Sequence, residues 1–184
     1  YLTLHVGAGT FKPVKSDTMA EHDMHAERLI FTDDFIDRLI AQKESGKVIP
    51  VGTTATRSLE SLYWWGVKIL NGTAIGNHVD IHQWEPYDYD SSQLPSTIDA
   101  LKKRLKESGA NELTGFTRII IAPGYQFHVI DALITNFHQP QSTLLLLVSA
   151  LVGDAWKDIY QYAMDNDFRF LSYGDSSLLF PAKK

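Results

Sequence analysis

The stretch Val48-Ile-Pro-Val-Gly-Thr-Thr-Ala-Thr-Arg-Ser-Leu-Glu-Ser-Leu62 decides the fold that we expect for this chain. It begins with an apolar run, breaks at Gly52, Thr53 and Thr54, and continues as a helix that carries Arg57. A buried strand that runs through a glycine into a helix is the repeating unit of α/β domains. Because the first N–H groups of a helix have no partner within it, this junction also predicts a site for a carboxylate or a phosphate. Simple helix capping is the alternative interpretation.

Strand and helix patterns alternate along the rest of the chain. Apolar runs rich in β-formers predict strands at 2–6, 27–31, 119–122, 129–134 and 168–171, and periodic or apolar runs predict helices at 33–45, 96–108, 143–152 and 155–166. Several strands are almost continuously apolar, which is typical of a sheet covered by helices on both faces. The sequence therefore predicts a single layered α/β/α domain over residues 1–184, with a mostly parallel or mixed sheet and an irregular insert at about 64–117.

The composition is that of a globular protein. The chain has 184 residues, of which 44% are hydrophobic and 21% charged, enough for a well-buried core. It contains no apolar run of about 18 residues, so we expect no membrane partner. The absence of cysteine excludes disulfides and thiol nucleophiles and is compatible with the cytoplasm, where we expect a monomer. The net charge of −5 argues mildly against a nucleic-acid partner.

Two predicted strands end in small and polar residues with a histidine at the break. One end lies within 2–11 and the other within 134–143. Glycine permits the backbone to approach a ligand closely, so we expect the two strand ends to form two walls of one site. The residues that these walls would contribute are His5, Gly7, Gly9, Thr10, Asn136, His138, Ser142 and Thr143.

The segment Glu21–Glu27 contains two histidines three residues apart, His22 and His25, flanked by carboxylates. On a helix this spacing could bind a divalent metal ion. Since histidine titrates near neutral pH, either residue could instead act as a general base. A polar loop before a strand is the third interpretation, and the residues alone leave all three open.

Two other groups of residues are weaker candidates. Ser142, His138 and Asp175 are the residue types of a hydrolase triad, but the Gly-x-Ser-x-Gly motif is absent. His78 and His82 lie four residues apart in the expected insert, and without a supporting pattern we interpret them as surface residues.

Six blocks of the chain resemble the C-terminal portion of the S-adenosylmethionine:tRNA ribosyltransferase-isomerase family. In chain order they are Leu4-His-Val-Gly-Ala-Gly-Thr-Phe11; Glu21-His22, Met24-His25 and Glu27; Val51-Gly-Thr-Thr54, Arg57 and Leu59-Glu-Ser61; Pro123-Gly-Tyr125; Leu133-Ile-Thr-Asn-Phe-His138 with Ser142-Thr-Leu-Leu145; and Ser172-Tyr-Gly-Asp175. They keep the family's order and cover nearly the whole chain. The first residue is tyrosine, and the family's β-barrel domain matches no part of the chain, so we expect that an N-terminal portion is missing.

The resemblance implies a specific reaction. The family transfers and isomerises the ribosyl group of S-adenosylmethionine onto the aminomethyl group of a 7-deazaguanine in tRNA, which gives epoxyqueuosine and releases adenine and methionine. S-adenosylmethionine is then a co-substrate, tRNA is the partner, and no metal is expected. A base must remove a proton from the ribose carbon beside the sulfonium. His5, His22, His25 and His138 are the candidates for that base, and the neighbouring carboxylates slightly favour His22 or His25.

The resemblance also implies a set of substrate contacts. The glycines near the N-terminus would let the backbone approach the adenosine, and the two helix N-termini would hold the methionine carboxylate or a tRNA phosphate. The residues expected to bind substrate are Gly7, Gly9, Thr10, Glu27, Thr53, Thr54, Arg57, Asn136, Ser142, Thr143, Tyr173 and Asp175.

One departure from the family bears on the substrate. Gln141 stands where family members often have a lysine, so a cation that could contact phosphate or carboxylate is lost. The alternatives are a divergent S-adenosylmethionine-binding paralogue with another acceptor, a metal-dependent hydrolase that uses His22 and His25, and a non-catalytic tRNA-binding module.

Overall fold

A four-stranded mixed sheet forms one layer of the computed structural model, which describes residues 3–5, 22–74, 76, 78–91 and 94–182. In spatial order its strands are β1 (Thr3–His5), β2 (Glu27–Thr32), β4 (Glu112–Thr117) and β3 (His78–Ile81). β2 pairs antiparallel with both β1 and β4, whereas β3 runs parallel to β4. The predicted α/β class with a mixed sheet is therefore confirmed.

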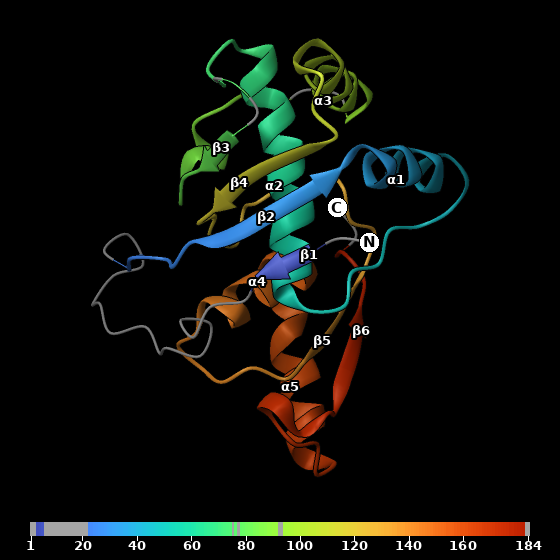
Figure 1. Ribbon diagram of the computed structural model, residues 1–184. Helices are drawn as coiled ribbons and strands as arrows, with labels where there is room; N and C mark the ends of the chain where they lie inside the picture. The colour runs from blue at the N-terminus through green and yellow to red at the C-terminus, as the bar shows by residue number, and fades with distance from the viewer. Residues whose placement is uncertain (1–2, 6–21, 75, 77, 92–93, 183–184) are drawn as a thin grey trace.

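Three helices form the layer that packs against this sheet (Figure 1). They are α1 (Asp33–Ser45), α2 (Thr53–Leu70) and α3 (Leu94–Ser108). Burial alternates along β2, where Glu27, Leu29 and Phe31 are buried and the residues between them are not. This period of two is typical of a sheet with one face on the core. Within the described residues, the helices accordingly cover one face of the four-stranded sheet.

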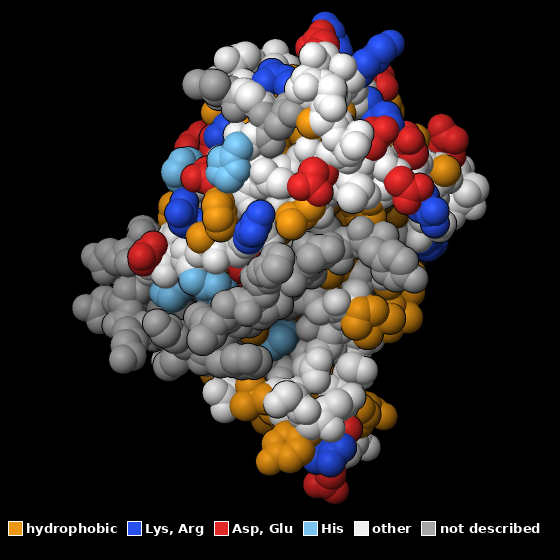
Figure 2. Space-filling view, viewed as in Figure 1, with side chains coloured by type: hydrophobic (Ala, Val, Ile, Leu, Met, Phe, Trp, Pro, Cys, Tyr) orange, Lys and Arg blue, Asp and Glu red, His pale blue; other side chains and the backbone are white. Residues whose placement is uncertain are grey.

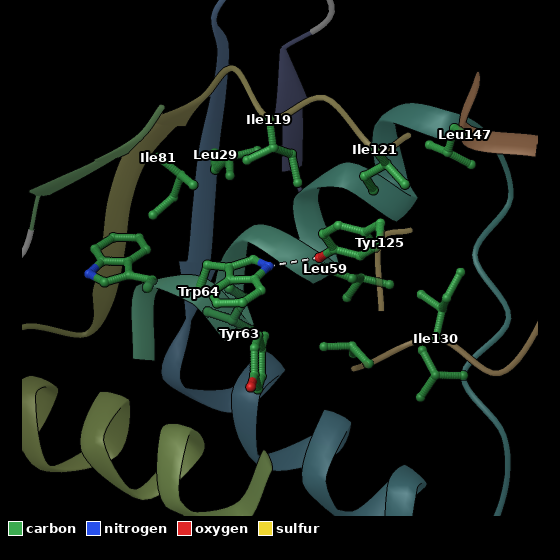
Figure 3. Packing of buried hydrophobic residues seen from close by; sticks show 14 of the residues in the cluster. Leu29, Leu59, Tyr63, Trp64, Ile81, Ile119, Ile121, Tyr125, Ile130 and Leu147 are labelled. Atoms are coloured by element: carbon green, nitrogen blue, oxygen red, sulfur yellow. Dashed lines mark hydrogen bonds between the residues drawn. The ribbon is translucent and has the colours of Figure 1, made fainter. Parts of the chain in front are cut away.

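Helix α2 lies at the centre of the core. Its aromatic residues Tyr63 and Trp65 are almost fully buried, and a Cβ placed on Gly66 would lie 2.5 Å from the backbone oxygen of Thr97 in α3. Only a residue without a side chain permits that approach. Figure 3 shows Trp64 donating a hydrogen bond from Nε1 to the hydroxyl of Tyr125, at 2.8 Å, among apolar side chains from the sheet and the loops.

A second group of elements lies below the sheet in Figure 1. It comprises the antiparallel pair β5 (Leu133–Asn136) and β6 (Ser176–Leu179), the helices α4 (Thr143–Val152) and α5 (Trp156–Asp165), and the short 3₁₀ turns η4 (Gly153–Ala155) and η5 (Leu171–Tyr173). A further 3₁₀ turn, η3 (Glu85–Tyr87), follows β3. One cluster of buried apolar side chains extends from β2 through α2 to α4 and α5, so both groups share a core.

The ends of two helices agree with the capping signals in the sequence. Thr32 precedes α1, and its Oγ1 accepts a hydrogen bond from the N–H of Phe35 at 3.2 Å. Gly46 ends the same helix, and Ser142 caps α4 in the way that Thr32 caps α1. These interactions join residues three apart, so they depend on local sequence alone.

Three predicted strands are corrected by the structure. Residues 48–51 are extended but form only an isolated parallel bridge, from Val51 to Ile134, and Val51 is 71% exposed. Residues 119–121 are buried after β4 without forming a strand, although the N–H of Arg118 donates to the carbonyl of Ile81 in β3 and the N–H of Ile120 donates to the carbonyl of Gln83. The closing strand is β6 rather than 168–171.

The segment 64–117, expected to be irregular, contains the end of α2 together with β3, α3 and β4. The short length of β3 and the glycine within β4 weaken the alternating pattern by which strands are predicted from sequence. Gly115 in β4 has its Cα so close to β3 that a Cβ would overlap the carbonyl oxygen of Val79. A glycine inside a strand marks such a close approach of two backbones.

Candidate active site

Glu27, the first residue of β2, lies at the centre of a cluster of predicted site residues. Its side chain is 1% exposed. Oε2 accepts a hydrogen bond from Nη1 of Arg57 at 2.8 Å, and Oε1 accepts one from the Thr54 hydroxyl at 3.1 Å. Nε2 of His25 lies 3.5 Å from the same Oε1. The fold therefore brings together four predicted residues from two separate segments.

The guanidinium of Arg57 is held inside the protein by this carboxylate and by a backbone carbonyl. Arg57 is 3% exposed, and its Nε donates to the carbonyl oxygen of Ile119 at 3.0 Å. Burial lowers the pKa of Arg57, and the negative charge of Glu27 opposes that shift. Within the described part of the chain Nη2 has no hydrogen-bond partner, although buried donors in proteins are nearly always paired.

The segment that contains His22 is fixed by a residue that the sequence did not single out. Gln83 follows β3, and its amide donates from Nε2 to the carbonyl oxygen of His22 at 2.6 Å. Its Oε1 accepts a hydrogen bond from the N–H of Met24 at 2.9 Å, and Met24 is buried. This pair of bonds imitates a strand partner. The two bonds hold the chain in place immediately before His25. No local sequence pattern around residue 83 predicts this role of Gln83.

The N-terminus of α2 lies beside β5. Gly52 has φ of 92°, a conformation that favours glycine, and its N–H donates to the carbonyl of Ile134 at 2.8 Å. The N–H of Ile134 in turn donates to the carbonyl of Pro50. Because these two extended segments are parallel, both lead toward the same edge. The start of α2 and the residues after β5 are thereby placed next to each other.

His138, after β5, is buried and structurally engaged. Its Nε2 lies 2.9 Å from the hydroxyl of Thr135, and its backbone N–H donates to the hydroxyl of Tyr160 at 3.0 Å. Burial lowers the pKa of His138 from 6.5 to about 4. A neutral imidazole with so low a pKa is a weak base. Nearby, the Asn136 amide donates to the carbonyl of Leu171 at 2.6 Å, so it braces the loop before β6.

Ser142 serves as the cap of α4. Its Oγ accepts a hydrogen bond from the N–H of Leu145 at 3.2 Å and donates one to the carbonyl of Gln139 at 2.7 Å. Thr143 is the first residue of the helix and is half-buried. Gln141 has φ of 57° in the preceding turn. Because Ser142 acts as a cap, an anion at this helix end would be bound by the first N–H groups of α4.

Tyr173 and Asp175 lie apart from the Glu27 cluster, in the turn that leads into β6. Arg169 pairs with Asp175 through Nε at 2.9 Å and through Nη2 at 3.1 Å, and its guanidinium lies 5.5 Å from the centre of the exposed Tyr173 ring. Hydrogen bonding to Arg169 lowers the pKa of Asp175 to about 2. Since Asp175 is paired with Arg169, and Ser142 is a cap, these residues do not form a triad with His138.

A buried carboxylate that the sequence analysis missed holds residues 128–130, which precede β5. Glu60 in α2 is fully buried, and its two oxygens accept hydrogen bonds from the N–H groups of His128, Val129 and Ile130 and from the Tyr125 hydroxyl. Burial raises the pKa of Glu60, and the four hydrogen bonds oppose that shift. A lone glutamate on the apolar face of a helix was the signal that could have identified it.

The remaining predicted residues can be placed only in part. The side chain of His5 and the residues Gly7, Gly9 and Thr10 lie outside the described residues. In Figure 2, histidine side chains are visible both at the upper left and near the middle of this face. His78 is exposed, as predicted, and its Nε2 lies 3.7 Å from Asp80.

The described residues contain no group of three or more His, Cys, Asp or Glu side chains arranged to hold a metal ion. In the same part of the chain, no helix has the length and apolar character needed to cross a membrane.

The fold and this cluster define an α/β domain whose polar centre combines a histidine, a buried carboxylate–arginine pair and a helix N-terminus. The chain belongs to the family described as queuosine biosynthesis protein, whose family model matches residues 1–179. Proteins named S-adenosylmethionine:tRNA ribosyltransferase-isomerase from Halothermothrix orenii and Cupriavidus pinatubonensis are each 40% identical to it over 181 residues, or 97% of the chain. This confirms the family resemblance seen in the sequence.

A solved structure is also similar. The S-adenosylmethionine tRNA ribosyltransferase from Thermotoga maritima superposes with a TM-score of 0.54 at 26% sequence identity, over 83% of this chain and 40% of that one. The chain spans about two fifths of the length of the curated relatives that it matches, 41% and 40% for the two named above.

Proposed function

We propose that this chain forms a catalytic portion of an S-adenosylmethionine:tRNA ribosyltransferase-isomerase, which transfers and isomerises the ribosyl group of S-adenosylmethionine onto a 7-aminomethyl-7-deazaguanine in tRNA to give epoxyqueuosine. The observation that carries the proposal is the 40% identity to relatives of that name over 97% of the chain. The cluster around Glu27 adds to it, because hydrogen bonds from Thr54 and Arg57 to Glu27 join two of the resembling blocks in space.

The reaction requires a base, an anion site and an enclosed reaction centre. The base removes a proton from the ribose carbon beside the sulfonium, whose positive charge makes that proton acidic. Methionine then leaves, and the amine of the tRNA base attacks the anomeric carbon as adenine departs. His22 and His25 remain the candidate bases on the described side of the site. His138 is disfavoured because burial lowers its pKa to about 4.

The N-terminus of α2 is the candidate site for the methionine carboxylate. Thr53 and Thr54 open this helix, and its positive end attracts an anion. The start of α4, with Thr143, is the second candidate and could bind the same carboxylate or a tRNA phosphate. Tyr173 and Asp175 lie far along the chain from both, in an exposed turn, so we assign them to contact with the larger substrate.

The partners follow from this assignment. We propose tRNA and S-adenosylmethionine as substrates, a cytoplasmic location and a monomeric state. The net charge of −5 means that phosphate contacts must come from local basic residues rather than from the overall charge.

The test measures adenine release. The natural protein that contains these residues is incubated with S-adenosylmethionine and with tRNA that carries the aminomethyl-deazaguanine, and unmodified tRNA serves as the control. We expect adenine in proportion to modified tRNA. No adenine above the no-enzyme level would refute the proposal. Release that requires a different acceptor would instead favour a paralogue, which the glutamine at position 141 makes the first alternative to examine.

A further inference from the structure

The carboxylate of Glu27 is positioned to act on a neighbouring histidine rather than on a ligand. With 1% of its side chain exposed, it is enclosed by the protein. Arg57 occupies Oε2 at 2.8 Å, and Thr54 occupies Oε1 at 3.1 Å. The third group at this carboxylate is Nε2 of His25, 3.5 Å from Oε1, and the His25 side chain is 25% exposed. Of these groups Arg57 is buried, whereas His25 and Thr54 are each partly exposed.

We infer that His25 is the base that removes the ribose proton and that Glu27 is a positioning residue that holds its ring. The inference rests on the proposed function and deepens it, because it separates His25 from His22. A carboxylate beside one ring nitrogen determines which nitrogen holds the proton and how the ring is oriented. This is the same logic by which an aspartate orients the histidine of hydrolase triads.

The proton that leaves the ribose carbon is taken up by the ring of His25. The C–H bond of the ribose carbon beside the sulfonium breaks, its electron pair stays on that carbon next to the positive sulfur, and the proton forms a new bond to a ring nitrogen of His25. The resulting imidazolium lies beside the carboxylate of Glu27, whose Oε1 is 3.5 Å from Nε2.

The same contacts connect the base to the anion site. Thr54, which donates to Glu27, is the second residue of α2, and Arg57 follows less than one turn later. A carboxylate bound at the start of α2 would thus be held by the element that also fixes Glu27. Such shared support allows one bound molecule to be aligned with both groups, and alignment of this kind contributes strongly to rate.

His22 is held differently from His25. The structure fixes His22 through its backbone carbonyl, which accepts the hydrogen bond from Gln83, so the restraint acts on the chain and not on the ring. Orientation of the ring is what a base requires, because proton transfer depends on the geometry of the lone pair.

The experiment follows the proton itself. The natural protein is incubated with S-adenosylmethionine in D₂O, and mass spectrometry measures deuterium entering the recovered S-adenosylmethionine; in parallel, adenine release is measured with modified tRNA. We expect His25→Asn to lower both rates by about 10²- to 10⁴-fold, the usual contribution of a general base. Glu27→Gln is expected to lower kcat by about 10- to 100-fold, as loss of an orienting partner does elsewhere, with little change in KM for S-adenosylmethionine.

A milder pair of variants guards against misfolding of Glu27→Gln. Thr54→Val removes one hydrogen bond to the Glu27 carboxylate, which should make proton transfer slower relative to the other steps. The isotope effect, measured with S-adenosylmethionine deuterated at the ribose carbon beside the sulfur, should therefore rise. Thr54→Ser keeps the hydroxyl and should restore the wild-type isotope effect. His78→Asn is the matched control, since His78 is also a histidine two residues before a carboxylate in the sequence, but on an exposed strand. It should leave both rates unchanged.

Three outcomes would overturn the inference. They are an exchange rate that falls with His22→Asn and not with His25→Asn, a Glu27→Gln variant altered only in KM or melting temperature, and an isotope effect that is the same in Thr54→Val as in the wild type. Failure of the proposed function has a different signature. If the wild type exchanges deuterium in a His25-dependent manner but releases no adenine with modified tRNA, the base assignment stands and the acceptor is wrong.

Discussion

Replacement of His138 by glutamine should remove a specific part of the pH dependence of stability. His138 is 8% exposed, and its pKa is lowered from 6.5 to about 4 by burial. The folded protein therefore holds this ring neutral, whereas the unfolded chain takes up a proton as the pH falls below about 6.5. Glutamine has a similar size and can still bond to Thr135, but it does not titrate.

The sign and size of the effect follow from the two pKa values. The stability that a neutral His138 contributes is fully present above the unfolded value of 6.5 and is lost as the pH falls through the folded value of about 4. The difference between 6.5 and about 4 corresponds to roughly 3 kcal/mol in all, at about 1.4 kcal/mol per pH unit. About 2 kcal/mol of this should be lost between pH 7 and pH 5.

The assay is urea denaturation of both proteins at a series of pH values, with the free energy of unfolding compared at each one. Other groups titrate in the same range, but they do so in both proteins and cancel in the difference. We expect the advantage of the wild type over His138→Gln to shrink by about 2 kcal/mol from pH 7 to pH 5. A difference that stays constant over this range would show that His138 titrates normally in the folded state and would refute the argument.

Three further substitutions test the packing and capping. Gly66→Ala should lower the free energy of unfolding by about 1–3 kcal/mol, because a Cβ there would lie 2.5 Å from the backbone oxygen of Thr97; thermal denaturation measures this, and an unchanged melting temperature would contradict the close approach. Ser142→Ala should cost about 0.5–2 kcal/mol through loss of the α4 cap, whereas Ser142→Thr should cost much less; equal losses in urea denaturation would argue against capping. Glu60→Gln should cost about 1–3 kcal/mol, since either orientation of the amide NH₂ faces a backbone N–H such as that of His128; a variant as stable as the wild type would mean that the carboxylate contacts are not needed.

The local elements were predictable because their signals lie within a few residues. Thr32 and Ser142 cap helices through N–H groups three residues ahead, and the apolar spacing of α1, α3, α4 and α5 indicated each helix near its observed bounds. β3 and β4 were missed because strands of four and six residues, one with an internal glycine, give little periodicity. That residues 1–184 form one domain stays a prediction.

The candidate site was predictable as a set of residues but not as an arrangement. His25, Glu27, Thr54 and Arg57 were all expected, from resemblance and from their residue types. Their separate roles could not be predicted. Glu27 was expected to contact substrate, but in the fold its carboxylate is enclosed by Thr54, Arg57 and His25. Gln83 had no signal at all, because its function depends on where the chain after β3 lies.

The sequence by itself determined the α/β class, the helix ends and the family, since each depends on residue type, short-range spacing or an ordered set of blocks. Only the tertiary structure decided which polar groups meet. Arg57 is 30 residues from Glu27, and Gln83 is 61 residues from His22. Contacts over such separations depend on strand register and on how α2 packs across the sheet, and a shift of one residue would turn Glu27 to the opposite face. The tertiary structure thereby distinguishes a neutral, buried His138 from a His25 held beside an enclosed carboxylate.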